Sequence, residues 1–135
     1  VYKRQVTPPL PHTPKDLRME LLLVGGIFTG GFLGGMARWA LSHIPAPRVG
    51  TWAANMVACS ILGFVYGQSL LVVMAFGTGF AGALSTWSTL AKELGQLIRD
   101  KDYGEALKYI VATAILGLVA AGFGLRWGAR AFGGV

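Results

Sequence analysis

Hydrogen-bond donors recur inside the apolar stretches of this chain, and their types limit the chemistry that the chain can support. They include the Asn55 carboxamide, the Trp87 indole N–H and the hydroxyls of Ser60, Ser85, Thr86, Ser88, Thr89, Tyr109 and Thr113. The middle of each apolar stretch lacks lysine and arginine. A path lined by neutral donors can replace the water around a small, strongly hydrated anion and still let the ion leave. These residues therefore favour anion permeation.

Each of these polar residues also has a purely structural interpretation. Asn55 could bridge two helices, and hydroxyls in membrane helices commonly bond the carbonyl four residues earlier. Tyr109 could anchor the chain at a membrane interface, and Arg38 could reach lipid phosphates. Glu93 could pair with Lys92 or with a neighbouring chain. The clustering of hydroxyls in the third apolar stretch is what favours a pore.

Residues suited to catalysis or to proton-coupled transport are missing from the apolar stretches. His12 lies in the N-terminal segment and His43 near the end of an apolar stretch. Carboxylates are absent from mid-stretch positions, and Glu20 stands only at an edge, which weakens a small four-helix drug/proton antiporter as the alternative. Cys59 is the only cysteine and excludes an intrachain disulfide. We expect no enzyme activity.

The composition indicates an integral membrane protein with one domain. Apolar residues make up 53% of the 135 residues and charged residues 13%, against about 25% charged in a soluble domain. The mean hydropathy is +0.54. The net charge of +6 comes from residues between and beyond the apolar stretches. This pattern fits lipid headgroups rather than nucleic acid, and a multi-pass protein of the plasma membrane.

The apolar stretches predict an all-α fold of four transmembrane helices within residues 19–135. The expected spans are residues 19–43, 51–67, 70–98 and 105–127, with lengths suited to a bilayer about 30 Å thick. Thr51 is a suitable N-cap for the second span. Residues 1–18 hold four of the six prolines and predict a basic, disordered tail.

The third span combines glycines with hydroxyls near the expected middle of the membrane. Gly77, Gly79 and Gly82 precede Ser85 and Thr86. This combination predicts a broken helix, which membranes tolerate only where protein or water satisfies the freed backbone groups.

Lysine and arginine are equally divided between the two sides of the expected bundle. One side carries Lys3, Arg4, Lys15, Arg18, Arg126 and Arg130; the other carries Arg38, Arg48, Lys92, Arg99, Lys101 and Lys108. Because the difference between these sums orients membrane proteins, the balance predicts insertion both ways and antiparallel pairing. Translation from Met19 would leave two against six and predict a single orientation.

Three motifs in this order resemble the Fluc (CrcB-type) fluoride channels. Residues 30–38 (GGFLGGMAR) are similar to the family's glycine-rich first helix, which ends in arginine. Residues 50–55 (GTWAAN), followed by ILGF at 61–64, are similar to the second helix. Residues 79–93 (GFAGALSTWSTLAKE) resemble the long, unusual motif of the third.

The resemblance implies an antiparallel dimer with two narrow fluoride pores. It places Asn55 as the pore amide and puts Trp87 and Leu90 at two phenylalanine positions. It assigns pore or pore-end roles to Arg38, Ser88, Thr89, Tyr109 and Thr113. The backbone carbonyls of Gly82 and Ser85 would hold a structural sodium ion at the dimer centre.

Both phenylalanine positions depart from the family pattern. An aromatic edge carries partial positive charge and can face an anion. Trp87 keeps such an edge and adds an N–H, whereas Leu90 has neither. The chain could therefore form a homodimer, or it could be the non-conducting or half-active partner in a pair of unlike chains.

Overall fold

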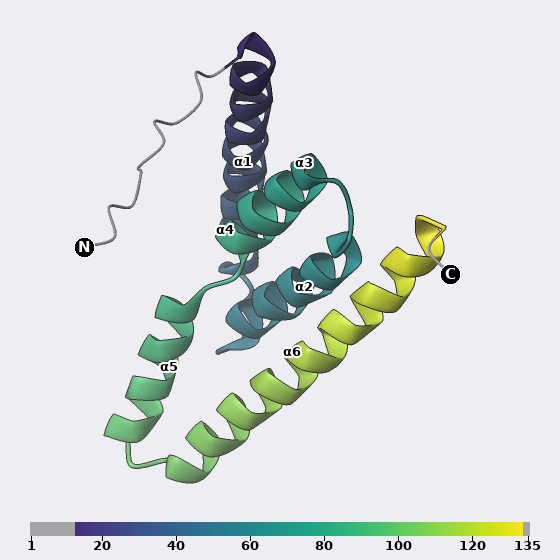
Figure 1. The fold of residues 1–135 in the computed structure, drawn as a ribbon. Helices are drawn as coiled ribbons and strands as arrows, with labels where there is room; N and C mark the ends of the chain where they lie inside the picture. Colours follow the sequence, from purple (N-terminus) through teal and green to yellow (C-terminus); the bar gives the residue numbers. More distant parts are fainter. Residues whose placement is uncertain (1–12, 134–135) are drawn as a thin grey trace, which may run out of the picture.

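The computed structural model describes residues 13–133, which form helices and the short connections between them (Figure 1). The helices are α1 (Pro14–Leu41), α2 (Val49–Val65), α3 (Leu70–Val72), η1 (Val73–Ala81), α4 (Gly82–Leu84), α5 (Trp87–Arg99) and α6 (Tyr103–Ala131). The all-helical class expected from the sequence is confirmed for this part of the chain.

Helix α1 begins earlier than the expected start at Met19. Thr13 and Asp16 form a capping box: the Asp16 carboxylate accepts from the Thr13 backbone N–H at 2.9 Å, and the Thr13 hydroxyl accepts from the Asp16 N–H. Pro14 fits the first helical turn because its missing N–H has no partner there in any helix. Residues 13–18, which the sequence placed in the tail, form the N-cap and the start of α1, while residues 1–12 of that expected tail lie outside the described part.

Helix α2 also begins before the expected N-cap. Its N-cap is Arg48, which makes no side-chain capping bond. Thr51, the expected cap, lies inside the helix and bonds elsewhere. Helix α6 likewise extends past both ends of the expected fourth span, with Asp102 as its N-cap.

The helices associate in two pairs, α1 with η1 and α2 with α6, and the two helices of each pair run in the same direction. Glycine allows the closest approach in each pair, because a Cβ on Gly30 would lie 2.0 Å from the Ala75 carbonyl oxygen of η1. A Cβ on Gly124 of α6 would lie 2.0 Å from the Ser60 oxygen of α2, and one on Gly128 would meet Phe64. Figure 1 shows α2 beside α6. Backbone therefore packs directly on backbone, as small residues permit in membrane helices.

The third apolar stretch is helical from Leu70 to Leu84 and then changes conformation. Its middle, η1, is a nine-residue π-helix. Ser85 and Thr86 follow in extended backbone, and α5 resumes at Trp87. Gly82, which the sequence placed within the interruption, has helical angles of φ −62° and ψ −40°.

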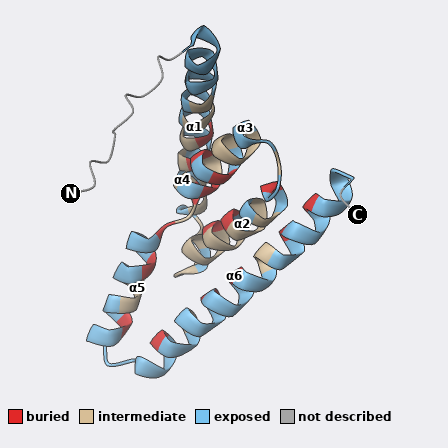
Figure 2. Cartoon of the chain, viewed as in Figure 1, coloured by how far each residue is buried: buried red, intermediate tan, exposed pale blue. Residues whose placement is uncertain are grey.

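Most of the described residues are exposed and few are buried, as Figure 2 shows. The exposed surface is strongly apolar. Ala54, Ala58, Ala81 and Leu84 form the buried core, while many large apolar side chains, such as Phe28, are exposed. Three helical stretches are long and apolar enough to cross a membrane: residues 14–41, 70–99 and 103–131. Helix α2 is apolar but shorter, with 17 residues.

Candidate functional site

Two pockets of similar size meet at Thr86. The first, of about 340 Å³, is called the Arg38 pocket here; its lining includes Arg38, Ser42, Thr51, Thr86, Ser88 and Thr89. The second, of about 350 Å³, is called the Asn55 pocket; its lining includes Asn55, Cys59, Ser85, Thr86, Trp87, Leu90 and Thr113. Elements distant in sequence, α1, α2, α5 and α6, thus bring most of the predicted donors together.

The Asn55 carboxamide is oriented by the extended segment. Its Oδ1 accepts a hydrogen bond from the Thr86 backbone N–H at 2.9 Å. With the oxygen engaged, the two N–H bonds of Nδ2 remain as donors for the pocket that Asn55 lines.

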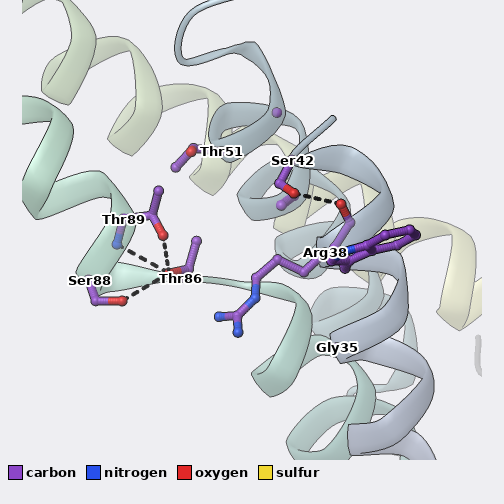
Figure 3. A pocket seen from close by; sticks show the side chains of 10 residues that line it. Gly35, Arg38, Ser42, Thr51, Thr86, Ser88 and Thr89 are labelled. Carbon is purple, nitrogen blue, oxygen red and sulfur yellow. Dashed lines mark hydrogen bonds between the residues drawn. The ribbon is translucent and has the colours of Figure 1, made fainter. Parts of the chain in front are cut away.

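Thr86 organises the start of α5 as well. Its side chain is only 6% exposed, and its Oγ1 accepts from the Thr89 backbone N–H at 3.3 Å, which makes it the N-cap. The same hydroxyl donates to Thr89 Oγ1 at 3.1 Å and lies 3.3 Å from Ser88 Oγ. Figure 3 shows these contacts, with the Arg38 side chain extending from α1 toward them. The Arg38 pocket therefore combines a cation with a cluster of hydroxyls.

Helix α6 contributes a buried hydroxyl to the Asn55 pocket. Thr113 is 9% exposed, and its Oγ1 has no hydrogen-bond partner among residues 13–133. A buried polar group without a partner costs free energy, so such a group in a pocket indicates a place where a ligand or water binds. On this wall the sequence-predicted Thr113 and Asn55 are brought together.

A second polar cluster joins α2, α5 and α6. The Glu93 carboxylate accepts from Thr51 Oγ1 at 2.7 Å and from the Tyr109 hydroxyl at 2.6 Å. The guanidinium of Arg48 lies over the Tyr109 ring, 5.9 Å from its centroid. Within residues 13–133, the hydrogen-bond partners of Glu93 are both hydroxyls. Glu93 forms no ion pair with Lys92, so that suggested pairing is wrong.

The two phenylalanine positions of the family behave differently in this chain. Leu90 is buried, at 6% exposure, and belongs to the wall of the Asn55 pocket. Trp87 lines the same pocket but is 74% exposed. Leu90 therefore fills space within the chain, while most of the indole projects from it.

Other predicted residues lie apart from this arrangement. Tyr109 is in the Glu93 cluster and lines neither pocket, and Gly82 also lines neither. The Ser60 hydroxyl donates to the carbonyl of Met56, four residues earlier, so its structural interpretation holds.

Thr86 and Thr51 have larger roles in the structure than their places in the sequence indicate. Thr86 was one hydroxyl among several, yet it lies at the junction of the two pockets. Its place directly after the glycine-rich half of the third stretch was the available signal. Thr51 precedes Asn55 by four residues, which puts both on one face of α2.

Two carbonyls beside the extended segment have lost their usual helical partners. In a continuous helix the Gly82 carbonyl would accept from the Thr86 N–H and the Ser85 carbonyl from the Thr89 N–H. Those N–H groups donate to Asn55 and to the Thr86 hydroxyl instead. The Gly82 carbonyl accepts from the Ser85 hydroxyl at 3.4 Å. A carbonyl oxygen has two lone pairs, so both carbonyls could still serve as oxygen ligands for a hard cation. Between residues 13 and 133, no group of three His, Cys, Asp or Glu residues could hold a metal.

Comparisons with known proteins agree on one family. Residues 26–125 match the family model described as "CrcB-like protein, Camphor Resistance (CrcB)". A Corynebacterium diphtheriae protein named "Fluoride-specific ion channel FluC 2" is 53% identical over 77% of this chain and 99% of its own length. A Bifidobacterium longum protein of that name is 36% identical over 94% of this chain and 78% of its own. "Fluoride-specific ion channel FluC" of Thermococcus kodakarensis is 39% identical over 78% and 96%.

Proposed function

The chain belongs to the CrcB-like family, and we infer that it is a fluoride ion channel, a multi-pass protein of the plasma membrane rather than an enzyme. The observation that carries this inference is the fixed amide of Asn55. Its oxygen is held by the Thr86 N–H, which leaves its N–H₂ group as a donor in a pocket that also contains the Thr113 hydroxyl.

Dehydration governs whether fluoride can enter such a pocket. The ion gives up strongly bound water only where aligned donors replace it. The Asn55 amide and the Thr113 hydroxyl offer neutral donors, which bind an anion without holding it as a fixed charge would. Passive export from the cytoplasm down the fluoride gradient is the activity that this lining supports.

The proposal extends to four spans and an antiparallel dimer. At 1.5 Å per residue, the 17 residues of α2 measure about 26 Å, close to the thickness of the hydrocarbon core. The parallel pairing of α1 with η1 and of α2 with α6 is what four alternating spans would give. The equal division of lysine and arginine, and the Trp87 side chain projecting from the chain, support a second copy in the opposite orientation.

We also propose that the dimer centre holds a sodium ion. The carbonyls of Gly82 and Ser85 would be its ligands, two from each chain, because both have lost their helical N–H partners. The ion would tie together two interrupted helices. Its role is structural in this proposal, and no step of fluoride passage depends on it.

Fluoride efflux from loaded liposomes tests the function directly. Purified chain should release fluoride rapidly, with a rate that does not change when the proton gradient is abolished. Efflux that required a proton gradient would favour an antiporter instead. The Leu90 side chain, which offers no donor, favours a second candidate, the partner subunit of a mixed pair. For that candidate the chain alone would be silent, and a second family member would restore efflux.

A further inference from the structure

Arg48 adopts a backbone conformation that its side chain does not favour. Its φ is +67°, in the left-handed region where residues with a Cβ are uncommon and glycine or asparagine is preferred. Arg48 is the N-cap of α2 but makes no side-chain capping bond. Local backbone structure therefore gives no reason for an arginine at this position. A strained residue that persists points to a role for its side chain.

The side chain of Arg48 is held against aromatic rather than acidic groups. It is half-buried, with its guanidinium 5.9 Å from the centre of the Tyr109 ring. Arg48 forms no ion pair within residues 13–133. The neighbouring carboxylate, Glu93, accepts hydroxyls from Thr51 and Tyr109 instead. The guanidinium has no carboxylate partner in this part of the chain and is thus available to an anion.

Arg48 also stands at the end of a row of donors. Arg48, Thr51 and Asn55 are three and four residues apart, so they follow one face at the start of α2. Tyr109 and Thr113 are four residues apart on α6, the helix that packs beside α2. Arg48 meets Tyr109. Asn55 lies about two turns further along α2 and Thr113 about one turn further along α6, and both line the same pocket.

We propose that Arg48 is the residue that receives fluoride at this end of the row, before the ion reaches the neutral donors around Asn55. The inference rests on the proposed function and adds to it a residue that determines the rate of anion entry. An unpaired guanidinium raises the local anion concentration through its field, and the effect falls as ionic strength rises. Attachment of the side chain to lipid phosphate is the competing explanation.

The chain supplies a matched control for the test. Lys101 is also cationic, also has a positive φ, of 61°, and lies on the same side of the expected bundle. It is exposed, in the turn between α5 and α6. Arg48→Asn and Lys101→Asn each remove one positive charge, and asparagine tolerates the left-handed conformation at both positions. Both variants should elute from gel filtration as the unmutated protein does.

The measurement is fluoride efflux from phosphatidylcholine liposomes at two ionic strengths. At about 10 mM salt, where the screening length is about 30 Å, Arg48→Asn should lower the efflux rate about threefold to tenfold. At about 150 mM salt the deficit should shrink to less than about twofold. Lys101→Asn should match the unmutated chain at both salts, and Arg48→Lys should retain most of the rate.

Two results would overturn the inference alone while fluoride still flows through the unmutated chain. In one, Arg48→Asn and Lys101→Asn behave alike. In the other, the loss in Arg48→Asn is equal at both salts, which is the behaviour of a structural or lipid-anchoring residue. Silence of the unmutated chain, alone and with a second family member, would overturn the proposed function and this inference with it.

Discussion

The amide oxygen of Asn55 and the backbone N–H of Thr86 are 31 residues apart in sequence and 2.9 Å apart in space. The bond joins the middle of α2 to the two extended residues between α4 and α5. It selects one of the two orientations of the carboxamide, so the N–H₂ group is the end left for the pocket. The bond also satisfies a backbone N–H that has no helical carbonyl partner at the extended segment.

Replacement of Asn55 should stop conduction while the chain still folds. Asn55→Leu removes the donor and leaves the lost water of fluoride unreplaced, at about 2 kcal/mol or more, so efflux should fall at least about tenfold. Asn55→Asp places a negative charge beside the path, and repulsion at low dielectric should abolish efflux. Both variants should elute from gel filtration in detergent as the unmutated protein does, because the glycine contacts are untouched. Asn55→Asp also keeps the acceptor for the Thr86 N–H, which Asn55→Leu loses. Normal efflux from either would exclude Asn55 from the path.

Thr86 should matter through its hydroxyl. Thr86→Val keeps the shape but loses the cap of α5 and the bonds to Thr89, which should cost about 1 kcal/mol of stability. Efflux should fall with it because Ser88 and Thr89 lose their fixed positions. Thr86→Ser keeps the hydroxyl and should recover most of both quantities. Thermal unfolding in detergent and liposome efflux measure the two effects. A larger defect in Thr86→Ser than in Thr86→Val would show that the methyl group matters instead.

The contact between α2 and α6 should be intolerant of a single methyl group. Gly124→Ala would put a Cβ 2.0 Å from the Ser60 carbonyl oxygen and force the two helices apart, at about 1–3 kcal/mol or more. Gly122→Ala is the matched control on the same helix, since nothing lies within 4 Å of its added Cβ. We expect a clearly lower unfolding temperature for Gly124→Ala only. Equal unfolding temperatures would show that α2 and α6 do not pack this closely.

Orientation in the membrane should respond to added charge. Three lysines inserted between Gln68 and Ser69 would unbalance the two sides and drive every chain into one orientation. Cysteines placed at the chain termini should react with impermeant reagents from both faces of the membrane before the insertion and from one face after it. Labelling from a single face in the starting protein would end the antiparallel dimer.

The sequence predicted the helical class well because apolar length and glycine spacing respond to the bilayer more than to tertiary detail. Helix ends were less accurate. Pro14 suggested a disordered tail, yet proline is at home in a first turn, and the reciprocal bonds of Thr13 and Asp16 extend α1 outward. Thr51 suggested a cap, but it bonds Glu93 on another helix, a partner that spacing within α2 cannot reveal.

The site was predictable as a set of residue types, not as a geometry. Asn55 and Thr113 were correctly grouped because an amide and a hydroxyl inside apolar helices need partners. The contact of Thr86 with Asn55 uses its backbone N–H. Every residue except proline has this group, so composition cannot single out Thr86. Arg48 has no carboxylate partner because Glu93 accepts from the hydroxyls of Thr51 and Tyr109, and these contacts depend on how α2, α5 and α6 pack together.

The π-helical turns of η1 determine the direction, around the helix axis, in which the later residues of the third stretch point. Each residue of an α-helix advances the chain by about 100° around the axis. A π-turn closes its hydrogen bond one residue later, so it accommodates an additional residue without turning the downstream segment by that amount. Shortening Val73–Ala81 by one residue at constant α-helical pitch would rotate Thr86 away from Asn55. The π-helical turns therefore fix the rotation about the helix axis at which the extended segment faces α2.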